Sequence, residues 1–184
     1  LSASLVWLST PAFAVDTAAR HAIMLDFETG AVLLDKESDV SMPPASMSKL
    51  MTIYLLFEQL ADGGVKLDDT FHVSEKAWRM GGSKMFVKVH SRVRVEDLLR
   101  GIIVQSGNDA CIVVAEGISG SESAFAEQMT RRAKEIGLTR STFKNATGWP
   151  DPEHRMSARD IATLSQRIIE DFPNYYPIFK EKRF

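Results

Sequence analysis

Two side chains of the sequence, Ser46 and Lys49, have the types and the spacing that nucleophilic catalysis requires. A separation of three residues places both side chains on one face of a helix. A serine hydroxyl is a weak nucleophile until a base takes its proton, and a neutral lysine amine can be that base. We therefore expect Ser46 to be a nucleophile and Lys49 its base, provided that the fold lowers the lysine pKa from its reference value of about 10.4.

The residues around this pair favour a neutral lysine. The helix that begins near Ser46 carries apolar residues on most of its sides, namely Met47, Leu50, Met51, Tyr54, Leu55 and Phe57. Burial disfavours the charged ammonium, and the positive end of the helix dipole acts in the same direction. Backbone N–H groups at the helix start can also stabilise an oxyanion. The simpler alternative is a serine that caps the helix and a lysine at the surface.

A second polar group, Ser106, Gly107 and Asn108, lies between two apolar segments. A hydroxyl at this point can relay a proton to or from Lys49, and the Asn108 amide can orient the lysine and bind a substrate amide. The alternative is an ordinary connection between helices, for which Ser, Gly and Asn are common choices. Cys111 follows Asn108 by three residues, so on a continuing helix it lies near the site, as an accessible or a buried thiol.

The elements that must position these residues follow from hydrophobic spacing. Residues 22–40 are predicted to form two strands joined by a turn at 28–30, and residues 68–93 have no helical period and contain a loop at 81–84. Residues 142–152 are rich in turn formers. Five helices are predicted. The first runs from Ser46 to a stop at Gly63-Gly64, and the next two cover 95–103 and 110–115. The fourth runs from a capping box at Ser119–Glu122 to Gly137, and the last begins at a cap at Ser157–Asp160. We expect a short strand pair followed by a mostly helical body.

The composition excludes several classes of protein. The 184 residues suit one domain with a sizeable core, and a net charge of −2 gives no basic field for nucleic acid. A single cysteine excludes an internal disulfide framework and a cysteine-built metal site. The four histidines have no metal-ligand spacing, so no metal is expected, and His90 and His154 are predicted to lie at the surface.

The first 14 residues resemble the second half of a secretory signal peptide. An apolar stretch leads to Ala12-Phe13-Ala14, and cleavage there would leave Val15 as the mature N-terminus. The basic region that normally precedes such a stretch is missing, so we expect the chain to be clipped at its start. The stretch is too short for a transmembrane helix, and the alternatives are a short buried strand or an unstructured leader. Export is the predicted destination.

Together the two motifs form the Ser-x-x-Lys and Ser-x-Asn pattern of penicillin-binding proteins and serine β-lactamases. The sequence resembles, more specifically, the serine-type D-alanyl-D-alanine carboxypeptidase family, the low-molecular-weight penicillin-binding proteins. The runs that carry the resemblance are PASMSKLMT (44–52), LRG (99–101), QSGNDA (105–110), NATG (145–148) and SARD (157–160). The resemblance extends from about residue 20 to the end of the chain. It implies an α/β (α+β) fold of the β-lactamase/transpeptidase type, with a helical body and an antiparallel sheet.

The resemblance also implies a role for each motif residue. Ser46 would form the acyl-enzyme, Lys49 would be the general base, and Ser106 would complete the proton-transfer network. Asn108 would contact substrate. The reaction would release the terminal D-alanine from peptidoglycan stem peptides that end in D-alanyl-D-alanine, without a metal or an organic cofactor. β-Lactams, which mimic that terminus, would acylate Ser46.

One element of the family pattern does not occur in the sequence. This is the Lys-Thr-Gly tripeptide that forms one wall of the family's site, and the sequence stops at Phe184. We therefore expect residues 15–184 to be an incomplete catalytic domain, truncated before the later strands, cut at both ends and inactive by itself. The family implies a periplasmic location, with contact to the outer face of the inner membrane through a missing C-terminal part.

Three alternative functions remain open. A β-lactamase-type acyl-serine hydrolase and a D,D-endopeptidase would use the same fold and nucleophile. A non-catalytic protein that binds β-lactam or peptidoglycan is also compatible with the sequence, because the third motif is absent. The loop at 145–150 and the Ser-Gly-Asn form of the second motif favour the carboxypeptidase.

Overall fold

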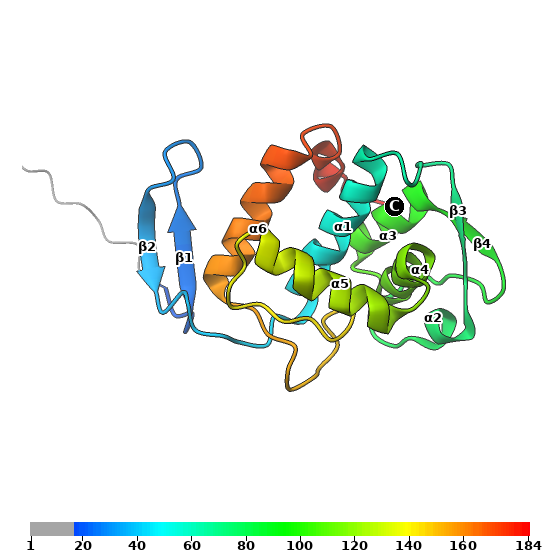
Figure 1. Ribbon diagram of the computed structural model, residues 1–184, viewed down its shortest axis with the longest axis horizontal. Helices are drawn as coiled ribbons and strands as arrows, with labels where there is room; N and C mark the ends of the chain where they lie inside the picture. Colours follow the sequence, from blue (N-terminus) through cyan, green and yellow to red (C-terminus); the bar gives the residue numbers. More distant parts are fainter. Residues whose placement is uncertain (1–16) are drawn as a thin grey trace, which may run out of the picture.

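One buried helix, α1 (Lys49–Ala61), lies at the centre of the molecule (Figure 1). The structure is a computed structural model, and it describes residues 17–184. Four further helices pack against α1, namely α3 (Val95–Gln105), α4 (Asn108–Ser119), α5 (Glu122–Glu135) and α6 (Ala158–Asp171). The predicted helical body is therefore confirmed.

The sequence of α1 explains its central position. Of its 13 residues, nine are buried, and they lie on every side of the helix. A helix that is apolar all round is stable only when other elements cover all of its faces. The helix ends at Ala61, and after Asp62 comes Gly63 with a φ of +73°, a left-handed conformation that glycine adopts without steric cost. The predicted stop at Gly63-Gly64 is confirmed.

Two small antiparallel sheets lie at opposite ends of the helical body (Figure 1). The first pairs β1 (Ala22–Leu25) with β2 (Val32–Lys36) and contacts α6, which confirms the predicted strand pair. The second pairs β3 (Thr70–His72) with β4 (Arg92–Arg94), and a short helix, α2 (Glu75–Arg79), follows β3. The sequence did not predict this second sheet, because strands of three residues carry too short a pattern to detect.

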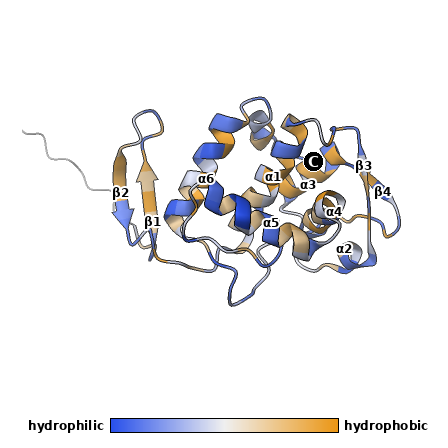
Figure 2. Ribbon diagram, viewed as in Figure 1, coloured by the Kyte–Doolittle hydropathy of each residue, from blue (hydrophilic) through white to orange (hydrophobic). Residues whose placement is uncertain are grey.

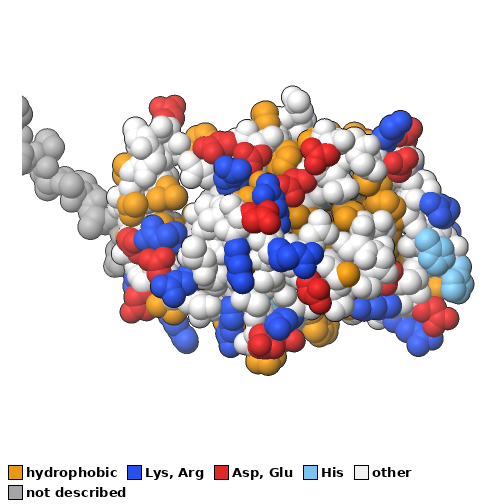
Figure 3. All heavy atoms as spheres, in the orientation of Figure 1, with side chains coloured by type: hydrophobic (Ala, Val, Ile, Leu, Met, Phe, Trp, Pro, Cys, Tyr) orange, Lys and Arg blue, Asp and Glu red, His pale blue; other side chains and the backbone are white. Residues whose placement is uncertain are grey.

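The core extends from α1 to the C-terminal segment through aromatic contacts. The ring centroids of Tyr54 and Phe172 lie 5.1 Å apart in an edge-to-face arrangement, and those of Phe57 and Tyr175 lie 5.2 Å apart in a stack. These contacts hold the end of α6 and the short helix η2 (Tyr176–Lys180) against α1. Figure 2 shows hydrophobic residues along α1 and α4 and hydrophilic residues along the outer side of α5. Lys, Arg, Asp and Glu side chains are interspersed across the face in Figure 3.

The helix starts are set by serine caps. The Ser121 hydroxyl accepts from the Ala124 N–H at the start of α5, and the Ser157 hydroxyl accepts from the Asp160 N–H at the start of α6. The predicted cap at 157–160 is confirmed. The predicted capping box is wrong in detail, because Ser119 is the last residue of α4 and the Glu122 carboxylate points inward. There it accepts from a loop N–H instead of from its own helix.

One predicted surface residue is buried. The His154 side chain is only 2% exposed, its Nδ1 accepts from the Lys144 N–H, and its ring packs edge-on against Phe143. The segment that carries His154 folds back on residues 142–144 through a bridge between Thr142 and Arg155. The polar residues around His154 in the sequence indicated an exposed side chain, but the pairing of residues 142 and 155 buries it. His90 is exposed, as predicted.

The predicted signal-peptide segment, residues 1–14, lies outside the described residues. Among residues 17–184, no helix is both long enough and apolar enough to span a bilayer.

Candidate active site

Ser46 and Lys49 lie in direct contact at the start of the central helix. Ser46 is part of the short helix η1 (Ala45–Ser48), which leads straight into α1. The Lys49 Nζ atom lies 2.8 Å from the Ser46 Oγ atom, within hydrogen-bond distance. Lys49 is 4% exposed, whereas Ser46 is open to solvent. The contact between the two side chains agrees with their predicted place on one face, and the burial of Lys49 agrees with the apolar residues around it.

The surroundings of Lys49 favour its neutral form. Burial lowers the pKa of the Lys49 ammonium below its usual value, and the nearby Cys111 opposes this shift weakly. Among residues 17–184, Ser46 Oγ is the hydrogen-bond partner of Nζ, so no carboxylate there restores the charged state. A lysine with a lowered pKa beside a serine hydroxyl can accept that hydroxyl's proton.

Cys111 lies in the first turn of α4, inside the core. Its side chain is fully buried in α4, and burial raises the pKa of the thiol to about 12. The thiolate is the reactive form of cysteine, so a pKa this high leaves almost none at neutral pH. Of the two expectations for this thiol, the buried one is confirmed. Helix α4, which carries Cys111, packs against α1, the helix that Lys49 begins.

Asn108 begins α4 and holds a loop in place. Its Nδ2 donates to the Gly81 carbonyl oxygen at 2.8 Å, and its backbone N–H donates to the Ser83 carbonyl oxygen at 2.8 Å. A Cβ atom at Gly82 would lie 2.6 Å from Asn108 Nδ2, so only glycine allows the loop to come this close. The predicted loop at 81–84 is therefore packed directly against Asn108 and held there by these two hydrogen bonds.

Ser106 directly follows α3 and has a left-handed conformation, with φ 55° and ψ 35°. This conformation is uncommon outside glycine and turns the chain sharply from α3 into α4. Within residues 17–184, its hydroxyl forms no hydrogen bond with Lys49 or Ser46. The proton relay through Ser106 thus stays a prediction.

The sequence reasoning missed Asp109, a fully buried carboxylate next to Asn108. Its Oδ1 accepts from the N–H groups of Met85 and Ala110, and its Oδ2 accepts from the Val87 N–H, at 3.0, 2.9 and 3.2 Å. It therefore ties residues 85–87 to the start of α4. The available signal was an acidic residue directly before the wholly apolar run 110–115, whose burial draws its neighbour toward the core.

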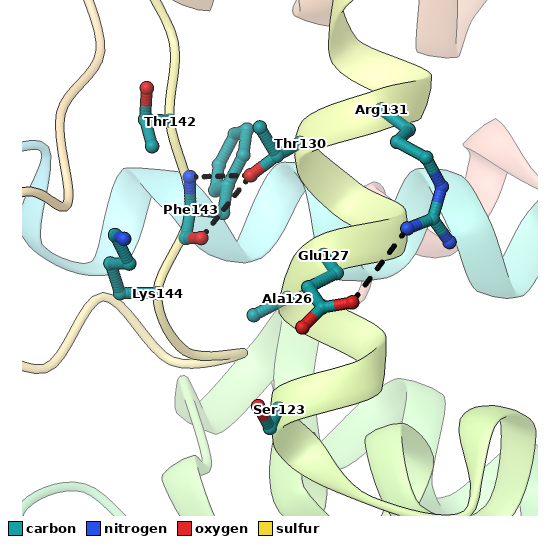
Figure 4. A pocket seen from close by; sticks show the side chains of 8 residues that line it. All are labelled: Ser123, Ala126, Glu127, Thr130, Arg131, Thr142, Phe143 and Lys144. Atoms are coloured by element: carbon teal, nitrogen blue, oxygen red, sulfur yellow. Dashed lines mark hydrogen bonds and ion pairs between the residues drawn. The ribbon is translucent and has the colours of Figure 1, made fainter.

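Two hollows of the surface are lined by none of the four predicted site residues. One is lined by Lys76, Arg79, Gly81, Glu122, Asn145 and Trp149, and Gly81 is the residue that holds Asn108. The other lies between α5 and residues 142–144 (Figure 4) and includes none of the four predicted site residues. In it the Thr130 hydroxyl bonds both the N–H and the carbonyl of Phe143, which fixes this segment to α5. Among the described residues, no group of His, Cys, Asp or Glu is placed to hold a metal ion.

Comparison with known proteins identifies the family. The sequence profile of the D-alanyl-D-alanine carboxypeptidase family matches residues 8–184. The chain is 41% identical to D-alanyl-D-alanine carboxypeptidase DacF of Bacillus subtilis, over 83% of the chain and 39% of that relative. It is 40% identical to DacC of Escherichia coli, over 90% of the chain and 43% of that relative. The chain thus spans about two fifths of the length of these curated relatives.

Solved structures agree with the sequence comparison. The D-alanyl-D-alanine carboxypeptidase DacD from Francisella tularensis superposes with a TM-score of 0.92 at 36% identity, covering 97% of the chain and 43% of that protein. Penicillin binding protein 5 from Haemophilus influenzae superposes with a TM-score of 0.87 at 36% identity, covering 96% and 51%. The predicted fold class is confirmed. The chain belongs to the D-alanyl-D-alanine carboxypeptidase family.

Proposed function

We propose that the protein is a serine D-alanyl-D-alanine carboxypeptidase that removes the terminal D-alanine from peptidoglycan stem peptides, in cell-wall biosynthesis and remodelling. The observation that carries the proposal is the 2.8 Å contact between Lys49 Nζ and Ser46 Oγ, made by a buried lysine whose pKa is lowered. The contact supplies a nucleophile and a base in one turn of helix. The family membership supplies the substrate class.

The proposed reaction has two halves. Neutral Lys49 takes the Ser46 proton while Oγ attacks the carbonyl carbon of the penultimate D-alanine. The tetrahedral intermediate collapses, and the proton passes to the departing amine. Free D-alanine is released, and the rest of the peptide stays bound to Ser46 Oγ as an ester. Water then attacks this ester, Lys49 takes the proton of the water, and the proton returns to Oγ as the shortened peptide leaves. β-Lactams would acylate the same oxygen.

Ser106 and Asn108 have supporting roles in this proposal. The Asn108 Nδ2 atom is already held by the Gly81 carbonyl, which leaves Oδ1 as the atom that accepts from the Lys49 ammonium or from a substrate N–H. Ser106 would relay the proton between Lys49 and the departing amine. No metal or organic cofactor takes part in any of these steps.

Ser46→Ala and Lys49→Arg test the proposal in the intact protein. We expect Ser46→Ala to abolish covalent labelling by a fluorescent penicillin and to stop D-alanine release from a diacetyl-Lys-D-Ala-D-Ala peptide. Lys49→Arg keeps the positive charge but cannot become neutral, so it should also lose acylation. Labelling of Ser46→Ala at the wild-type rate would reject Ser46 as the nucleophile.

The same assays separate the remaining functions. Penicillin labelling without D-alanine release would indicate a non-catalytic binding protein, and fast penicillin hydrolysis would indicate a β-lactamase-type enzyme. A D-alanyl-D-alanine endopeptidase of Escherichia coli matches at 29% identity, below the 36–41% of the relatives named carboxypeptidases. Carboxypeptidase activity is therefore favoured over endopeptidase cleavage of cross-links.

We also propose that the protein is exported to the periplasm and acts at the outer face of the inner membrane. The apolar stretch that ends in Ala12-Phe13-Ala14 supports a signal peptide over residues 1–14, with residues 15–184 in the catalytic domain. N-terminal sequencing of protein recovered from the periplasm should start at Val15. Recovery of uncleaved protein from the cytoplasm alone would reject export.

A further inference from the structure

A loop that carries none of the predicted catalytic residues presses against the turn that holds Ser46. This loop, residues 145–149, includes Gly148, which has a φ of +81°. A Cβ atom at Gly148 would overlap the carbonyl oxygen of Ala45 and would lie 2.6 Å from Ser48 Oγ. Because those two atoms are joined by a 3.1 Å hydrogen bond, Gly148 abuts both partners of a contact that shapes the η1 turn.

The η1 turn needs such external support. Ala45, the residue directly before Ser46, has a φ of +49°, a left-handed conformation that costs free energy for any residue with a Cβ atom. A strained residue keeps its conformation only when its surroundings hold it there. Here the close backbone of Gly148 on one side and the Ser48 hydroxyl on the other leave the Ala45 carbonyl little room to rotate.

The 145–149 loop is itself fixed by its own first residue. The Asn145 Oδ1 atom accepts from the N–H groups of Thr147, Gly148 and Trp149 at 3.1, 2.8 and 3.0 Å. The Asn145 Nδ2 atom donates to the Trp149 carbonyl at 2.9 Å. One side chain thus closes the loop and sets the position of Gly148.

Two buried side chains attach this loop to the body of the protein. The Thr52 hydroxyl of α1 donates to the Ala146 carbonyl at 2.7 Å, and the Glu122 carboxylate of α5 accepts from the Ala146 N–H at 3.1 Å. The loop therefore contacts α1 and its leading turn at Ala45, Ser48 and Thr52, which a helical spacing of three and four residues places on one face. Ser46 and Lys49 lie on the adjacent face.

We propose that the 145–149 loop positions the nucleophile. In this proposal the backbone of Gly148 keeps the Ala45 carbonyl from rotating, and Asn145 holds Gly148 in place. The inference rests on the proposed function, since it concerns how far Ser46 Oγ lies from Lys49 Nζ and from the bound carbonyl. A displacement of about 1 Å at reacting atoms can cost about 100-fold in rate. Neither residue touches the reacting atoms in this proposal, so both are positioning residues.

The test compares Gly148→Ala with Gly120→Ala in the intact protein. Gly120 directly follows α4 with a φ of +75°, and nothing lies within 4 Å of a Cβ atom built there. Both variants carry the same type of backbone strain, but only Gly148→Ala drives a methyl group into the Ala45 carbonyl. The readouts are the melting temperature, the non-covalent binding constant for a penicillin, and the first-order acylation rate constant.

We expect the acylation rate constant of Gly148→Ala to fall about 100-fold, with penicillin binding changed by less than about threefold, and that of Gly120→Ala to stay within about twofold of wild type. Equal acylation by the two variants would overturn the inference. If Gly148→Ala does not fold, Asn145→Ala provides the test, since it removes the loop's hydrogen bonds without creating an overlap. It should lower the acylation rate constant about tenfold, and Asn145→Asp, which keeps the Oδ1 acceptor, should recover most of the loss.

An Asn145→Ala protein that acylates at the wild-type rate would also overturn the inference. The proposed function is tested separately by the wild-type protein and Ser46→Ala. Absence of acylation in wild type would reject the carboxypeptidase proposal, whereas normal wild-type acylation with an unaffected Gly148→Ala variant would reject only the positioning role.

Discussion

Replacing Asp109 by asparagine should loosen residues 85–87 and lower the stability of the protein. The two oxygens of Asp109 accept from the N–H groups of Met85, Val87 and Ala110 inside the protein. An amide keeps one oxygen and replaces the other by an NH₂ group. If the oxygen stays on Met85 and Ala110, the Val87 N–H faces a second donor and loses its partner.

The magnitude follows from the bonds that are lost. A hydrogen bond to a charged group contributes about 1.5–3 kcal/mol, and a buried donor left without an acceptor costs about 1–3 kcal/mol. These contributions overlap, so we expect Asp109→Asn to lower the free energy of unfolding by about 2–4 kcal/mol. At about 2–4 °C per kcal/mol for a chain of this size, the melting temperature should fall by about 4–16 °C.

A matched control is available in α3. Asp97 also lies in the first turn of a helix, but it is partly exposed and pairs with Arg94 at 3.2 Å. Surface ion pairs contribute little, so Asp97→Asn should change stability by less than about 1 kcal/mol. Thermal and urea unfolding of both variants measure the difference. If the melting temperatures of Asp109→Asn and Asp97→Asn lie within about 2 °C of each other, the two variants differ in stability by only about 1 kcal/mol or less. That result would refute the anchoring role of Asp109.

Three further predictions concern Lys49, Cys111 and His154. Lys49→Met removes an ammonium that burial disfavours, so it should abolish acylation by penicillin without lowering the melting temperature. A lower melting temperature would contradict the pKa direction assigned to Lys49. Cys111, with a thiol pKa of about 12, should resist a bulky thiol reagent at pH 7.5, and acylation should be unchanged, as mass spectrometry and labelling will report. His154 has a pKa that burial lowers below its ordinary 6.5, so the unfolded chain binds a proton more readily than the folded one. Stability should therefore decline as the pH falls below about 6.5, and His154→Gln should flatten that decline in pH-dependent unfolding curves.

The parts of the fold that the sequence predicted are those governed by local rules. The period of apolar residues in α1 and α3, the serine cap of α6 and the glycine stop after α1 each depend on neighbours within one or two turns. The nearness of Ser46 and Lys49 belongs to the same class, because a separation of three residues along a helix brings the two side chains to one face.

The parts that the sequence did not predict depend on partners distant along the chain. His154 is buried because residues 142 and 155 pair, and Asp109 is buried because it binds residues 85 and 87. The contact of Gly148 with Ala45 joins positions about one hundred residues apart. No local period encodes such contacts. His154, a polar residue in a loop, was therefore predicted to be exposed, although it is buried.

Departures from the ordinary rules of folding gather around the candidate site. Among residues 17–184, five non-glycine residues have a positive φ, and of these Ala45 precedes Ser46, Ser106 precedes Gly107-Asn108, and Phe86 lies between the two loop residues that Asp109 binds. Lys49 adds a buried amine in an apolar helix. Each departure costs free energy that the surrounding core offsets, and such costs persist where function requires them. Because the offset comes from α1, α4 and the loops attached to them, the same contacts that stabilise the fold also hold the Ser46 hydroxyl against the Lys49 amine.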